Sequence, residues 1–164
     1  MKTVVGQAKI NSFALIFADF KEITKARLAI SVVFSSVAGY FLGAEQLSLS
    51  AILLLSFGGY CMVGASNAYN QVIERDLDAL MSRTANRPIP AGRMSVNTVM
   101  TIAVFLTVLG VVSLYFLNAK TAMFGAISIF LYTSVYTPLK TKTPLAVFVG
   151  AFPGAIPFML GWVA

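Results

Sequence analysis

The sequence predicts an all-α, polytopic transmembrane helix bundle, and two observations lead to that prediction. Of the 164 residues, 58% are apolar and 11% are charged, whereas a soluble globular domain has about 45–50% apolar and about 25% charged residues. Five apolar runs approach the ~20 residues that a helix needs to cross a bilayer: 26–44, 48–70, 95–117, 119–136 and 145–164. An ordinary soluble enzyme, a disordered tail and a coiled coil are therefore excluded.

The segment before the first span differs from the rest of the chain because polar and apolar residues are mixed in it. Large apolar residues recur at helical spacing between charged ones, at Phe13, Ile16, Phe17, Phe20 and Ile23. This pattern predicts a helix that lies in the membrane interface and leads into the bilayer. We therefore divide the chain into an interfacial segment, 1–25, and a membrane domain, 26–164.

The later spans contain prolines, which interrupt helical hydrogen bonding. Pro138, Pro144, Pro153 and Pro157 are expected to break or kink these helices, and Gly150–Pro157 is expected to be irregular. The fifth run ends without a polar flank, and five spans is an odd number. From this we expect the chain to be the first part of a larger bundle.

The basic residues predict which side of the membrane each segment faces. The net charge of +6 would suit nucleic acid or an anionic membrane surface, and the apolar runs decide for the membrane, with no nucleic acid as a partner. Eleven of the 12 basic residues fall in 1–27, which ends just inside the first span, in 71–94 or in 137–144. The positive-inside rule then places these segments in the cytoplasm.

Polar side chains that could bind a metal ion or take part in catalysis lie close together where the second run ends. At 100° per residue, Asn70, Glu74 and Asp78 lie at about 0°, 40° and 80° around a helix axis, with Asn67 at about 60°. Asp76 lies at about 240° and faces away. Hard oxygen ligands in such a stripe suit Mg²⁺, which one or two carboxylates hold together with substrate phosphates. The chain has no histidine and one cysteine, so no softer ligand set competes.

Basic side chains surround this acidic stripe in the sequence. They are Arg75, Arg83, Arg87 and Arg93, with Tyr136 and Lys140 after the fourth run. Guanidinium groups beside a carboxylate–Mg²⁺ site are suited to a diphosphate. The alternative is a set of solvated ion pairs in a cytoplasmic loop, where arginines are common in any case.

Several motifs resemble those of the UbiA-type intramembrane prenyltransferases. Asn70-x-x-x-Glu74-x-x-x-Asp78, followed by Arg83-Thr-x-x-Arg87-Pro, is similar to the first aspartate-rich motif of that family. Tyr136-Thr-Pro-Leu-Lys140 resembles its Tyr-x-x-x-Lys element, and residues 23–27 resemble its first-helix Thr-Lys-Pro-Arg. The chain departs from the family pattern at Gln71 and Glu74, where aspartate is usual, and at Ala26, where proline is usual.

The resemblance implies a bundle of about nine helices around a cavity, of which these five spans would be the first part. Residues 74–84, 87–93 and 136–162 are most similar to the branch that transfers a farnesyl group from farnesyl diphosphate to a vinyl group of haem b. The implied roles are Mg²⁺ and catalytic contacts for Asn70, Glu74 and Asp78, and diphosphate contacts for Arg27, Arg83, Arg87, Tyr136 and Lys140. The implied location is the bacterial plasma (inner) membrane, with haem A synthase or oxidase subunits as assembly partners.

Two other functions remain open at this point. One is a sibling prenyltransferase that acts on 4-hydroxybenzoate, a naphthoate or chlorophyllide. The other is a membrane protein that binds or transports a cation without catalysis. The family's second aspartate-rich motif has no counterpart here, because no acidic residue follows Asp78. Whether residues 1–164 are active by themselves is therefore also open.

Overall fold

The computed structural model describes Lys2–Ala164, and the surroundings of the side chains from Phe13 onward. This part of the chain is helical and contains no strand, which confirms the all-α class. The elements are α1 (Lys2–Ile23), α2 (Ala26–Gly43), α3 (Leu49–Leu80), α4 (Val96–Tyr115), α5 (Ala119–Phe130), the π-helical segment η1 (Leu131–Tyr136), α6 (Thr137–Leu139) and α7 (Ala146–Val163).

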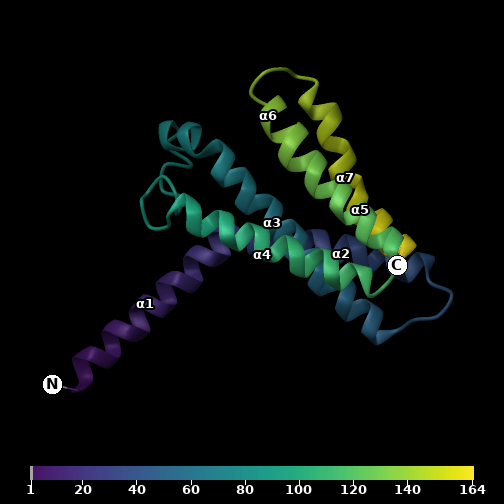
Figure 1. Cartoon of the computed structure of the whole chain (residues 1–164), viewed down its shortest axis with the longest axis horizontal. Helices are drawn as coiled ribbons and strands as arrows, with labels where there is room; N and C mark the ends of the chain where they lie inside the picture. The colour runs from purple at the N-terminus through teal and green to yellow at the C-terminus, as the bar shows by residue number, and fades with distance from the viewer. Residues whose placement is uncertain (1) are drawn as a thin grey trace.

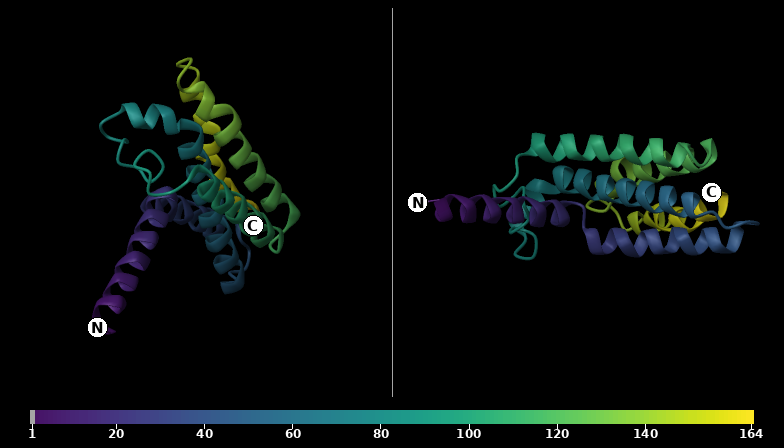
Figure 2. Two further views of the ribbon diagram at one scale, coloured as in Figure 1. Left: turned by 60° about the vertical axis from the view of Figure 1, so that its left-hand side comes forward. Right: turned by 90° about the horizontal axis from the view of Figure 1, so that it is seen from below.

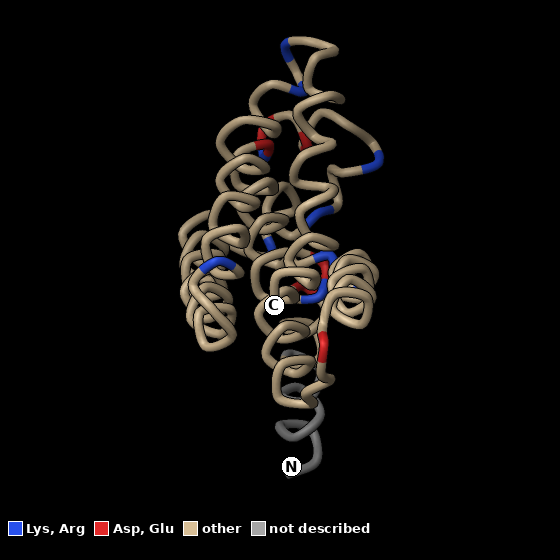
Figure 3. Tube along the Cα trace, turned by 90° about the vertical axis from the view of Figure 1, so that its right-hand side faces the viewer, with Lys and Arg blue, Asp and Glu red and all other residues tan. Residues whose placement is uncertain are grey.

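Five helical stretches of the described residues are long and apolar enough to cross a membrane. They are Ala26–Gly43, Leu49–Leu80, Val96–Tyr115, Ala119–Leu139 and Ala146–Val163. Figure 3 shows that charged residues gather near helix ends and in connecting segments, while long stretches of the helices carry none. The predicted polytopic bundle is thereby confirmed.

Helix α3 is longer than its apolar part. It has 32 residues, which at 1.5 Å per residue is about 48 Å, compared with a bilayer hydrocarbon core of about 30 Å. The apolar run that the sequence indicates ends at Asn70, but the helix continues for ten further residues, to Leu80. The acidic stripe therefore lies on a helical extension of a span and not in a loop.

The fourth span passes Pro138 without ending there. A π-helical segment, Leu131–Tyr136, precedes this proline, and the Thr137 N–H donates to the carbonyl of Tyr132, five residues earlier. The ring of a proline collides with the carbonyl four residues before it in a regular α-helix. Because the wider turn relieves that collision, the helix continues as α6 to Leu139.

The expectation of an irregular segment at Gly150–Pro157 is wrong. Helix α7 runs unbroken from Ala146 to Val163 with Pro153 and Pro157 inside it. Each proline removes one backbone donor, and a helix packed among neighbouring helices tolerates that loss. Helix α7 contacts both α2 and α5, so tertiary packing supports it where local hydrogen bonds are missing.

The five spans form a ring in which each helix contacts the next. The order is α2, α3, α4, α5 and α7, and α7 closes the ring by packing against α2. Figures 1 and 2 show that the α3–α4 pair and the α5–α7 pair diverge toward the C-terminal end of α3. The ring is therefore widest near the acidic stripe.

Helix α1 leaves the bundle at an angle, as Figure 1 shows. Its residues Phe13, Ile16 and Phe17 are exposed, whereas Ile23 at its end is fully buried. Arg93 anchors this helix to the segment after α3 through ion pairs of 2.8 Å with Asp19 and 2.8 Å with Glu22. The hydrogen bond to Asp19 raises the pKa of the Arg93 guanidinium. The location of α1 in the membrane interface stays a prediction.

Candidate active site

The polar stripe of α3 is buried on one side of the helix. Asn67, Asn70, Glu74 and Asp78 are all less than 9% exposed, in keeping with their shared face. Asp76 points the other way: its side chain is 86% exposed and lies 3.5 Å from the Arg75 guanidinium. Two carboxylates and two amides are thus turned toward the interior, where each needs a polar partner.

Glu74 finds its partners on the same helix and at the end of the fourth span. The Nδ2 atom of Asn70 donates to Glu74 Oε2 at 2.9 Å, and the Lys140 ammonium lies 2.5 Å from Glu74 Oε1. Lys140 also donates to Asn70 Oδ1 at 3.3 Å, as does the hydroxyl of Thr137 at 3.1 Å. The Tyr136–Lys140 element and the acidic stripe therefore meet, as their resemblance to family motifs implies.

Asp78 is paired with the segment that follows α3. Arg87 Nη1 donates to Asp78 Oδ2 at 2.6 Å, and both side chains are largely buried. The Thr84 hydroxyl donates to the backbone carbonyl of Asp78 at 2.9 Å. The chain after Leu80 therefore folds back over the end of α3 and brings one arginine into the site.

Lys25 is a third cation near the carboxylates, and the sequence interpretation does not include it among the site residues. It has φ 47° and ψ 57°, and it is the one non-glycine residue in the described part of the chain with positive φ. Burial lowers the pKa of its ammonium, and the charges of Arg87 and Lys140 lower it further, against the effects of Glu74 and Asp78. The sequence does contain a signal for Lys25, because it lies within residues 23–27, which resemble a family motif. From that motif only Arg27 is assigned a role.

Two arginines with implied roles lie apart from this cluster. Arg27 and Arg83 are exposed, and within residues 13–164 neither side chain forms an ion pair or hydrogen bond with the stripe. Arg27 lines a shallow depression together with Lys21 and Lys25. Diphosphate contacts by Arg27 and Arg83 stay predictions.

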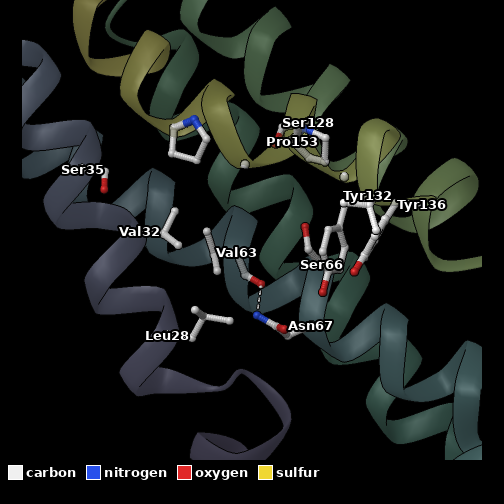
Figure 4. A pocket seen from close by; sticks show the side chains of 15 residues that line it. Leu28, Val32, Ser35, Val63, Ser66, Asn67, Ser128, Tyr132, Tyr136 and Pro153 are labelled. Atoms are coloured by element: carbon white, nitrogen blue, oxygen red, sulfur yellow. Dashed lines mark hydrogen bonds between the residues drawn. The ribbon is translucent and has the colours of Figure 1, made fainter. Parts of the chain in front are cut away.

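An apolar pocket of about 510 Å³ opens beside the polar cluster. Its walls come from α2, α3, the fourth span and α7, and Figure 4 shows Leu28, Val32 and Val63 on one side and Tyr132, Tyr136 and Pro153 on the other. Asn67 and Tyr136 line the pocket and lie within one helical turn of Asn70 and Lys140. The charged cluster therefore sits at the end of a cavity that suits a hydrocarbon chain.

The donor set of the stripe fits a magnesium ion that is shared with a substrate. Within the described residues no three His, Cys, Asp or Glu side chains converge on one point. The chain does offer two carboxylates and an amide oxygen, from Glu74, Asp78 and Asn70, all buried on one face of α3. One or two carboxylates completed by phosphate oxygens are the usual arrangement for Mg²⁺.

Comparison with known proteins decides the family. The UbiA prenyltransferase family matches residues 32–164. The chain belongs to the UbiA prenyltransferase family. This UbiA chain is 75% identical over 154 residues to the protoheme IX farnesyltransferase of Christiangramia forsetii, and the match covers 94% of this chain and 51% of that protein. It is 38% identical over 149 residues to the mitochondrial protoheme IX farnesyltransferase of Yarrowia lipolytica, covering 90% and 32% of the two chains.

Solved structures show the same fold at low sequence identity. A UbiA homologue from Archaeoglobus fulgidus, bound to DMAPP and Mg²⁺, matches with a TM-score of 0.79 and 16% identity, over 88% of this chain and 53% of that one. A digeranylgeranylglyceryl phosphate synthase matches with a TM-score of 0.83 and 19% identity, over 90% and 52%. This UbiA chain thus spans about half the length of the Christiangramia forsetii protein and of these two solved structures.

Proposed function

We propose that this chain supplies the first carboxylate site of a protoheme IX farnesyltransferase, which joins the farnesyl group of farnesyl diphosphate to a vinyl carbon of haem b. The observation that carries the proposal is a pair of buried carboxylates, each ion-paired with a cation, at the end of an apolar pocket. The cluster suits a diphosphate, and the pocket suits an isoprenoid. The names of the bacterial relatives support farnesyl and haem as the substrates.

The chain's own cations would receive the departing diphosphate. Lys140 pairs with Glu74 and Arg87 pairs with Asp78, each within 2.6 Å of a carboxylate. Fixed positive charge where negative charge develops lowers the barrier to breaking the carbon–oxygen bond. The Tyr136 ring lies 5.8 Å from the Lys140 ammonium and also lines the pocket.

Asn70, Glu74 and Asp78 would hold Mg²⁺ together with the diphosphate. When bound, the ion supplies Lewis-acid stabilisation of the diphosphate as it leaves. The amide of Asn70 would help to orient Glu74 for this role, because it donates a 2.9 Å hydrogen bond to Glu74 Oε2.

The pocket would shield the allylic cation from water while it waits for the acceptor. Its walls are mainly apolar, with Leu28, Val32, Val63 and Val147 among them. The vinyl group forms the new carbon–carbon bond, and water then adds to the resulting cation on the porphyrin side and releases a proton. The overall result is a hydroxyethylfarnesyl substituent and free diphosphate.

The distribution of basic residues supports a cytoplasmic location for the site. Lys25, Arg87 and Lys140 all belong to the segments that carry eleven of the 12 basic residues. Because such segments are retained on the cytoplasmic side, we propose that the site opens to the cytoplasm from a bacterial inner membrane.

A chimera tests this function directly. In it, this chain replaces the segment that it matches in the Christiangramia forsetii protein, to which it is 75% identical. Membranes containing the chimera, farnesyl diphosphate, haem b and Mg²⁺ are expected to form haem O and release diphosphate. Conversion of 4-hydroxybenzoate or a naphthoate instead of haem would assign a sibling activity. Cation binding without release of diphosphate would favour a non-catalytic protein.

The pocket also makes a prediction about the length of the prenyl chain. A Cβ atom added at Gly154, which lines the pocket, would meet nothing within 4 Å. In the chimera, Gly154→Leu is therefore expected to fill space and shift the ratio of kcat/KM for farnesyl over geranyl diphosphate by about tenfold toward the shorter substrate. Ala155→Leu, an exposed position on the same helix that does not line the pocket, is the control. An unchanged ratio in Gly154→Leu would show that the chain binds elsewhere.

A further inference from the structure

We infer that Gln71 is a positioning residue for the diphosphate site: its amide holds the joint between α1 and α2 in the conformation that brings Lys25 beside the carboxylates. This inference rests on the proposed function. It assigns to Gln71 a task that differs from that of its neighbours on α3, since it acts on backbone and not on metal or substrate.

The contacts of Gln71 point away from the carboxylates and toward α1. Its side chain is 1% exposed, and its Nε2 atom donates to the carbonyls of Glu22 at 3.2 Å and Ile23 at 3.3 Å. One turn earlier on α3, Asn67 Nδ2 donates to the carbonyl of Thr24 at 3.4 Å. Two amides of α3 thus bind three consecutive carbonyls at the end of α1, where a helix leaves acceptors free for other donors; the Glu22 carbonyl also accepts the backbone N–H of Lys25 at 3.3 Å.

The residue that follows these three carbonyls is Lys25, in the left-handed conformation with φ 47°. L-residues other than asparagine, aspartate and glycine seldom adopt this conformation, and it persists only where the surroundings hold it. The side chain of Lys25 itself forms no hydrogen bond or ion pair among the described residues that would hold the turn. The buried amides of α3 are the groups placed to do so.

The consequence for the site is electrostatic. Lys25 directly follows Thr24, whose carbonyl accepts a hydrogen bond from Asn67 of the acidic stripe at 3.4 Å. Its ammonium is partly buried there, and the charges of Glu74, Asp78, Arg87 and Lys140 all act on its pKa. With Lys25 the cluster has three cations and two carboxylates, and therefore a net positive charge that favours an anion. Without the turn, α2 would begin in another direction, and the third cation would leave the cluster.

The chemistry of the side chain explains why an amide is needed at this position. A carbonyl oxygen accepts hydrogen bonds, so only a donor can bind it, and an ionised carboxylate has none to offer. A glutamate at 71 would place negative charge against the carbonyls of Glu22 and Ile23. A methionine would fill the same space but would leave the carbonyl of Ile23 without the donor that Gln71 supplies.

The test uses the chimera and the KM for farnesyl diphosphate. We expect Gln71→Met to raise this KM about tenfold with little change in the KM for haem, and Lys25→Met to do the same. Because Gln71 acts through Lys25, the double variant is expected to match Lys25→Met alone, whereas independent roles would multiply the two effects. Gln71→Asn keeps an amide but is one methylene shorter, and it is expected to give a smaller rise.

The control is Ser113→Ala, which removes another buried hydrogen bond to α3, from the Ser113 hydroxyl to the carbonyl of Leu54 at 2.9 Å. It is expected to leave the KM for farnesyl diphosphate unchanged. If Gln71→Met does not fold, the Gln71→Asn and Lys25→Met pair provides the same comparison. An active chimera whose KM is unaffected by Gln71→Asn, or whose double variant shows multiplied effects, would overturn this inference alone. An inactive parent chimera would overturn the proposed function instead.

Discussion

Replacing Asp78 with asparagine in the chimera is expected to lower kcat for haem O formation by about 10²–10³-fold, comparable to the loss of one preorganised charge-stabilising group in other enzymes. Asp78 is buried and lies 2.6 Å from Arg87. The substitution removes a proposed Mg²⁺ ligand and leaves the guanidinium without its anion. The measurement is the initial rate of diphosphate release at saturating substrates, with Mg²⁺ varied to detect a weakened metal requirement.

Asp76→Asn is the matched control. It makes the same chemical change two residues away, on a side chain that is 86% exposed and faces outward. We expect its kcat and its dependence on Mg²⁺ to equal those of the parent chimera. Equal losses in both variants would mean that the buried face of α3 has no special role, and full activity of Asp78→Asn would remove Asp78 from the site.

Replacing Gly161 with valine is expected to have the largest effect on folding. An added Cβ atom at Gly161 would collide with the carbonyl of Ser36 and lie 2.6 Å from the backbone nitrogen of Tyr40. These are backbone atoms of α2, so no side-chain rotation can relieve the clash. Overpacking of this kind costs about 3 kcal/mol or more, and close approach through small residues is what holds membrane helices together. We expect a loss of folded protein in detergent and a lower Tm for what remains.

Gly154→Ala provides the comparison for this prediction. It lies on the same helix, two turns earlier, where an added Cβ atom would meet nothing within 4 Å. Its yield and Tm are expected to match those of the parent chimera. If Gly161→Val proved equally stable, the contact between α2 and α7 could not be as tight as described.

The spans and the acidic face could be predicted from the sequence because each depends on a local rule. The length of apolar runs predicts five spans, and helical spacing predicts that Asn70, Glu74 and Asp78 share a face that Asp76 does not. Both rules hold here because α3 stays regular to Leu80. Spacing alone could not predict that Asp78 pairs with Arg87 while Arg83 is exposed, since that depends on how the chain folds back after the helix.

The features that the sequence did not predict depend on tertiary contacts. The prolines of α7 indicate an interrupted helix by local rules, but packing against α2 and α5 keeps it continuous. The left-handed conformation of Lys25 has no signal in its own residue type, because it is held by amides 42 and 46 residues later in the chain. Only the assembled bundle brings Asn67 and Gln71 to that turn.

The ion pairs of Glu74 with Lys140 and of Asp78 with Arg87 mean that the resting protein satisfies its own charges. An arriving diphosphate must therefore compete with carboxylates for cations that are already engaged, and a metal ion must compete with those cations for the carboxylates. If the two arrive together, each releases the partner that the other requires. Joint entry of anion and metal is then favoured over the entry of either one by itself.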